Sequence, residues 1–110
     1  METSRAVGSR DRPDVTQLVA YITGNLCHLA LERKEWLNAE LLARQALPLS
    51  EEVGRLDLIA TDSHQLSRAL LSQGKKAEAL GHARRAVELY TRLGSPDLAE
   101  VCEILAECES

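Results

Sequence analysis

The chain has 110 residues, of which 45% are hydrophobic and only 3% aromatic, and its formal net charge at pH 7 is −4. A chain of this length fits one small domain, and its acidic balance argues against general affinity for nucleic acid, which needs a basic surface. No apolar run approaches the roughly 18–20 residues of a membrane span, and residues 1–14 lack the apolar stretch of a secretory signal. We therefore expect a cytoplasmic protein that binds neither nucleic acid nor membrane.

The composition predicts an all-α fold. Leu, Ala, Glu and Arg are strong helix formers, and no stretch shows the alternation of apolar and polar residues that is typical of a strand. Residues 1–12 offer little that a core could bury, and we expect them to form a flexible lead-in. The folded domain is then expected over residues 13–110.

The first helix is expected to run from Pro13 to about Glu32. Pro13 and Asp14 suit the first turn of a helix, and apolar residues then recur at helical spacing. These residues are Leu18, Val19, Ile22, Leu26, Leu29 and Ala30. Gly24 inside the helix costs about 1 kcal/mol relative to Ala, which indicates a close neighbour or an opening beside it.

A turn at Arg33–Lys34 leads to the second helix, which is expected to begin near Glu35. Pro48 lies inside its apolar pattern and removes one backbone donor, so it predicts a kink or a break. Gly54 suits the C-terminal cap. The apolar pattern consists of Trp36, Ala39, Leu42, Ala43, Ala46 and Leu49.

Three further helices follow. The third is expected at about 56–72 and the fourth at about 76–93, with Gly74 and Gly94 after them. The fifth is expected at about 96–107, because Ser95–Pro96–Asp97 is a strong helix start signal. The connections are short, so neighbouring helices should be antiparallel.

Three alanines recur at a fixed period. Ala79, Ala83 and Ala86 each lie 40 positions after Ala39, Ala43 and Ala46. Such self-similarity is typical of repeat proteins, in which each unit buries its face on the next. We expect one hairpin over 13–54, a second over 55–94 and a closing helix over 95–109.

These residues resemble the tetratricopeptide repeat (TPR) family, and the long period is similar to its kinesin-light-chain-type variants. Lys34, where the family usually has Gly, and Lys76, where it usually has an aromatic, depart from the pattern. The resemblance covers about 14–107 and implies antiparallel hairpins stacked as a short right-handed solenoid of about five helices. The residues expected to pack the repeats are Trp36, Ala39, Ala43, Ala46, Gly74, Ala79, Ala83 and Ala86.

The resemblance also implies a concave groove, lined by the first helix of each hairpin, that holds a peptide or a partner helix. The amide of Asn25 suits a ligand backbone because it donates and accepts, and Arg68 suits a partner carboxylate. For any single position, a plain solvated helix face remains the alternative. The groove residues are expected to be Tyr21, Asn25, His28 and Glu32 in the first hairpin, and His64, Gln65, Arg68 and Ser72 in the second.

No catalytic or metal-binding motif stands out. Asp62, Ser63 and His64 are residue types of a triad, but adjacent helical residues point apart. Cys27, Cys102 and Cys108 lack CxxC spacing, so we expect reduced, mostly buried cysteines. We therefore expect no enzyme activity, no cofactor and no metal. The alternative to a protein-interaction role is a small-molecule or metal-sensing domain, with Cys27, His28 and His64 as the candidate contacts.

The expected function is a non-catalytic protein-interaction module or scaffold. The fifth helix is acidic, through Asp97, Glu100, Glu103, Glu107 and Glu109, which indicates either a solubilising cap or a docking face for a basic partner. Its apolar stripe could lack a cover, so a self-assembling unit that homodimerises through this helix is the alternative. A sensor role in a bacterial signalling assembly follows from the resemblance alone.

Overall fold

The computed structural model describes residues 13–110, and the expected lead-in over 1–12 lies outside them. Five helices make up this part of the chain, which contains no strand, so the all-α prediction is confirmed. They are α1 (Pro13–Glu32), α2 (Trp36–Val53), α3 (Leu56–Ser72), α4 (Lys76–Leu93) and α5 (Leu98–Glu109).

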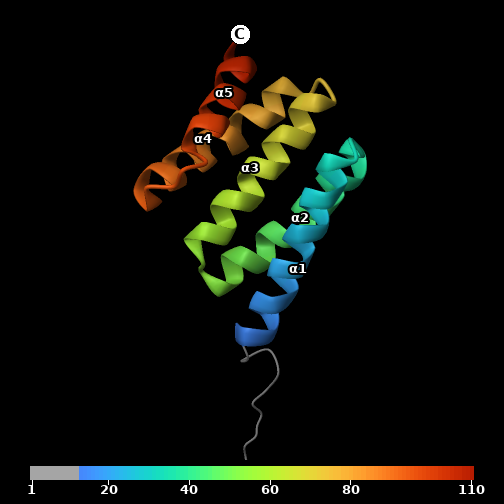
Figure 1. Cartoon of the computed structure of the whole chain (residues 1–110), viewed down its shortest axis with the longest axis vertical. Coiled ribbons are helices and arrows are strands. Elements are labelled where there is room, and N and C mark those ends of the chain that lie inside the picture. Colours follow the sequence, from blue (N-terminus) through green and yellow to red (C-terminus); the bar gives the residue numbers. More distant parts are fainter. Residues whose placement is uncertain (1–12) are drawn as a thin grey trace, which may run out of the picture.

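Each helix packs against the next one in the chain, and α3 also contacts α1 and α5. In Figure 1, α3 lies between α1 and α5, with α2 and α4 behind them. None of these five helices is both long and apolar enough to cross a membrane. The arrangement leaves α1 at one end of the stack of helices and α5 at the other.

Most helix ends fall where the sequence predicts them, because left-handed residues follow the helices. Gly54, Gly74 and Gly94 have φ angles of 80°, 81° and 65°, a conformation that Gly adopts without strain. Lys34 follows α1 with φ 61° and is the one non-Gly residue with positive φ in the described part of the chain. The turn after α1 is therefore built like the glycine turns, but with a lysine.

Two expected boundaries differ in the structure. Helix α2 continues through Pro48 to Val53, so the helix does not break there; only one backbone donor is lost, and Pro48 itself is exposed. Helix α5 begins at Leu98, two residues late, because Pro96 and Asp97 form a turn. In that turn the backbone N–H of Asp97 donates to Ser95 Oγ at 3.1 Å.

Small side chains let the helices approach closely. All six of the recurring alanines, Ala39, Ala43, Ala46, Ala79, Ala83 and Ala86, are fully buried. Most of them pack with Cys27, Leu31, Leu66 and Leu70 in the main core, with Trp36 partly buried against it. A second cluster joins α3, α4 and α5 through Ile59, Tyr90 and Val101.

A buried carboxylate ties α2 to the turn between α3 and α4. Glu40 Oε1 accepts hydrogen bonds from Gln73 Nε2 at 2.8 Å and Lys75 Nζ at 3.2 Å. Its Oε2 accepts from Arg44 Nε at 2.8 Å. These bonds, that of Gln73 first, lower the pKa of Glu40 to about 2. The charge is therefore retained despite burial, because it is fully partnered.

The apolar pattern of α1 does not mark the face that α1 buries. Its buried residues are Ala20, Cys27, Ala30 and Leu31, whereas most of the patterned ones are exposed. The exposed set is Leu18, Val19, Ile22, Leu26 and Leu29. Helix α5 shows the opposite: Val101, Ile104 and Cys108 are buried, so its apolar stripe is covered.

Candidate functional site

A groove runs along α1, α3 and α5. It consists of four adjoining pockets of about 550, 250, 170 and 380 Å³. The first and second share Tyr21, the second and third share Gln65, and the third and fourth share Arg68. The pockets are therefore continuous from the start of α1 to the end of α5.

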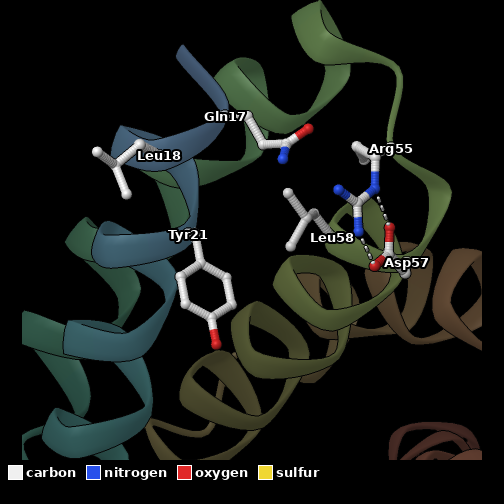
Figure 2. A pocket seen from close by; sticks show the side chains of 6 residues that line it. All are labelled: Gln17, Leu18, Tyr21, Arg55, Asp57 and Leu58. Atoms are coloured by element: carbon white, nitrogen blue, oxygen red, sulfur yellow. Dashed lines mark hydrogen bonds and ion pairs between the residues drawn. The ribbon is translucent and has the colours of Figure 1, made fainter. Parts of the chain in front are cut away.

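The outer end of the groove lies between α1 and the start of α3. Figure 2 shows Tyr21 of α1 across this pocket from Leu58 and from the ion pair of Arg55 and Asp57. Arg55 donates from Nε to Asp57 Oδ1 at 2.9 Å and from Nη2 to Oδ2 at 2.6 Å. These bonds lower the pKa of Asp57. This end therefore offers an aromatic ring beside a neutralised pair of charges.

Asp62 lies at the floor of the second pocket. It is buried, and Ser50 Oγ donates to its Oδ2 at 2.6 Å. Burial raises the pKa of Asp62 to about 6. Gly24 covers it, since a Cβ at that position would lie 3.4 Å from Asp62 Oδ1. Asp62 is thus the close neighbour that the internal glycine of α1 predicts.

His64 occupies the third pocket together with residues of α4 and α5. Its Nδ1 shares a hydrogen bond of 3.1 Å with Tyr90 Oη, and the two rings meet edge to face with centroids 5.6 Å apart. Glu100 Oε2 lies 3.4 Å from Nε2 without forming a hydrogen bond. Burial lowers the pKa of His64, while Glu100 and Asp97 act in the opposite direction.

Three buried polar atoms make no hydrogen bond within the described residues: Ser63 Oγ, His64 Nε2 and Gln65 Oε1. Leaving such an atom unpaired costs about 1–3 kcal/mol. Gln65 Oε1 is an acceptor, and Gln65 lines both the second and the third pockets. A donor on a ligand in the groove could satisfy it.

The structure brings most of the expected groove residues together. Tyr21, Asn25 and His28 are exposed along α1, and Ser72 is exposed at the far end. His64 and Gln65 are only 9% and 8% exposed, so the alternative of a plain solvated helix face does not hold at these two positions. They are buried because α3 has helices on both sides.

Glu32 does not line any of the four pockets. Its Oε2 lies 3.1 Å from His28 Nε2 one turn earlier on α1. The sequence did not predict several residues that line the groove, some of them on α3 itself and others on α4, α5 and the turn between these two helices. These are Asp57, Leu58, Thr61, Asp62, Tyr90, Asp97, Glu100, Glu103 and Glu107.

The lining of the groove is acidic. Asp57 is neutralised by Arg55, but Asp62, Asp97, Glu100, Glu103 and Glu107 add further carboxyl groups, mostly from α5. Arg68 is the second basic residue among those that line the four pockets. The α5 side of the groove therefore carries an excess of negative charge.

Within the described residues, the triad residue types and the candidate metal ligands that the sequence offers do not come together. His64 Nδ1 contacts Tyr90 rather than Asp62, and Cys27 donates from Sγ to the Ala39 carbonyl at 3.2 Å. Burial raises the pKa of Cys27 to about 12. Within residues 13–110, no group of three His, Cys, Asp or Glu side chains could hold a metal ion.

Comparison with family models, with curated proteins and with solved structures finds no match to this chain. The resemblance of its alanine and glycine spacing to a known family therefore has no support from a relative. What the chain does is inferred from its own groove and surfaces.

Proposed function

We propose that this chain is a non-catalytic protein-interaction module whose TPR-like repeats hold a short peptide or helix in the groove. The observation that carries the proposal is the continuity of the groove across α1, α3 and α5. Polar groups able to grip a backbone lie along it, with the Asn25 amide on one wall and Gln65 Oε1 in the floor. The spacing of small residues supports the same proposal, because it is typical of TPR hairpins.

The charge of the groove selects the partner. Glu100 and Glu103 of α5 face the groove from its far side, and they attract a segment that carries Lys or Arg. Electrostatic complementarity of this kind contributes mainly to specificity and to the rate of association. The partner is therefore a peptide with at least one basic residue, placed toward α5.

The length of the groove limits the length of the peptide. Packed helices lie about 8–10 Å apart, so the outer two of three neighbouring helices are about 20 Å apart. An extended chain rises about 3.3 Å per residue. A segment of about six extended residues therefore spans the groove from α1 to α5.

Selection from a library of random hexapeptides displayed on phage tests this proposal. The full-length chain is the target, and the selected peptides are then titrated by fluorescence anisotropy. Peptides with Lys or Arg should be enriched. Their affinity should fall at least tenfold for Glu100→Lys/Glu103→Lys, because two attractive carboxylates become repulsive ammonium groups.

The matched control is Glu52→Lys/Glu88→Lys, which makes the same charge change at exposed positions of α2 and α4 outside the groove. This control should bind like the wild type, and circular dichroism should show that both variants fold. Failure to enrich any peptide would contradict the proposal, and so would equal binding by both variants.

A further inference from the structure

Helix α1 exposes an apolar stripe that nothing in the described residues covers. The α1 stripe consists of Val15, Val19, Ile22, Leu26 and Leu29, each 44% to 49% exposed. On a helical wheel it lies opposite Gly24, which faces Asp62 of α3. It is also separate from Tyr21, Asn25 and His28, which line the groove.

The spacing of the α1 stripe is that of a helix that pairs with another helix. Its members are separated alternately by four and three positions, the pattern of the apolar positions in a coiled coil. Such a seam is self-complementary, because knobs of one helix fit holes of an identical one. The same patch on two copies also satisfies a two-fold interface, which closes at two copies.

The corresponding face of α3 shows what this kind of surface does inside the chain. Leu66 lies 40 positions after Leu26 and is only 1% exposed, because it packs with Cys27 and Ala39 of the first hairpin. In α1 no helix precedes within residues 13–110 to do the same. The face of α3 that is equivalent to the α1 stripe is therefore buried, because another hairpin lies next to it.

The opposite end of the stack does not offer a complementary surface. The apolar residues Val101 and Ile104 of α5 are buried, and its outer face exposes only small side chains, Ala99, Cys102 and Ala106, with Glu103 beside them. Placing the α1 stripe there would bury the carboxylate of Glu103 without offering a matching surface of large apolar side chains, which is costly. Like-with-like pairing of two α1 stripes avoids this cost, whereas head-to-tail stacking does not.

A pocket beside the α1 stripe widens the apolar surface. It has a volume of about 270 Å³ between α1 and α2, and Leu26, Leu29 and Leu42 line it. The five side chains of the stripe expose on the order of 400 Å² per copy, which is the size of the largest apolar patch on a typical monomer, and such patches are often functional. With the flanking rims, two copies approach the about 1,200 Å² at which specific interfaces begin.

We propose that this chain forms a homodimer in which the α1 stripe of one copy packs against the α1 stripe of the other. The interface lies on α1 rather than on α5, whose apolar residues are already covered. Both grooves stay open, because their residues on α1 lie on another side of the helix, except for Leu18 at the edge of the stripe. An interface of this size lies at the small end of specific interfaces, where weak and transient complexes are found.

Sedimentation equilibrium of the full chain over a range of concentrations tests the homodimer. The wild type should reach twice the 12.1 kDa chain mass. Ile22→Glu/Leu26→Glu should stay monomeric at concentrations about 100-fold higher, because the interface would bury four carboxylates per dimer. Both side chains are about half exposed in the single chain, so these changes leave its core intact.

The matched control is Leu37→Glu/Leu41→Glu, which makes the same change at exposed leucines of α2 outside the stripe. It should dimerise like the wild type. A wild type that is monomeric throughout would overturn the homodimer. Assembly beyond two copies would overturn like-with-like pairing, and dimerisation of the α1 variant as tight as that of the wild type would overturn the assignment to α1.

Cross-linking gives a second, independent readout. Ile22 is the middle residue of the α1 stripe, so it meets its own copy whether the helices are parallel or antiparallel. In a Cys102→Ser background, which removes the exposed native thiol, a short bismaleimide should join copies that carry Ile22→Cys. Copies that carry Leu37→Cys should stay single. Equal cross-linking at both positions would contradict the interface.

Discussion

At the scale of single residues, the most informative side chain is the carboxyl group of Asp62. It is buried between Ser50 and Gly24 at the floor of the groove, and Ser50 Oγ donates to it. Its folded pKa is about 6, against about 3.9 in an unfolded chain. As the pH rises, the unfolded chain therefore loses this proton first. Stability falls between about pH 4 and pH 6, by about 2–3 kcal/mol in all.

Asp62→Asn should remove this loss, because the amide stays neutral and its oxygen can still accept from Ser50. We expect the variant to exceed the wild type in free energy of unfolding by about 2 kcal/mol at pH 7.5, with the difference vanishing near pH 4. Urea unfolding at a series of pH values measures it. An Asn variant that is less stable than the wild type at pH 7.5 would contradict a raised pKa of Asp62 caused by burial. A difference in free energy of unfolding that does not change with pH would contradict it too.

Groove residues could be predicted from the sequence where they lie on the first helix of a hairpin, but their exposure could not. Tyr21, Asn25 and His28 of α1 are such residues, and they line the groove as expected. The burial of His64 and Gln65 could not be predicted, because it depends on which helices flank α3. The partner of His64 is Tyr90, 26 positions later, and no local pattern indicates that pairing.

At the scale of the helices and turns, the sequence predicts the structure better than it predicts the surroundings of single residues. Glycines and short connections place most ends of the five helices correctly, because a left-handed residue is a local requirement. The face that α1 buries could not be predicted, since an apolar stripe does not indicate whether it packs against helices of the same chain or against another surface. Ala20, Cys27 and Ala30 are buried instead, because small side chains let α2 and α3 approach.

The turn after α1 stores a local cost that the turn after α3 avoids. Lys34 has φ 61° where Gly74 has φ 81°, and both turns close with a 2.9 Å backbone bond, to the carbonyls of Ala30 and Leu70. A left-handed non-Gly residue costs about 1–2 kcal/mol, of which the greater entropy of an unfolded Gly offsets about half. Lys34→Gly should therefore raise the free energy of unfolding by about 0.5–1 kcal/mol.

Urea unfolding of Lys34→Gly beside its mirror variant Gly74→Lys provides the measurement and its control. The mirror variant should lower stability by a similar amount, since it introduces a left-handed lysine in the matching turn. A Lys34→Gly chain that is less stable than the wild type would show that the side chain of Lys34 contributes more than its backbone strain costs.

At the scale of the whole molecule, the groove and the α1 stripe occupy different sides of the same helix. The groove needs side chains from α1, α3 and α5 together, so its continuity and its acidic side emerge only when the helices pack. The proposed homodimer joins two chains through α1 and leaves two grooves free. Such a dimer would bind a partner with two basic segments more tightly than one groove does.

The measurement that tests the central claim most directly is an NMR titration of the ¹⁵N-labelled chain with a selected basic hexapeptide. We expect the largest shift changes at the side-chain amides of Asn25 and Gln65 and along the groove residues of α3 and α5. The outer faces of α2 and α4 should change little. Shift changes confined to those outer faces, or none at saturating peptide, would contradict binding in the groove.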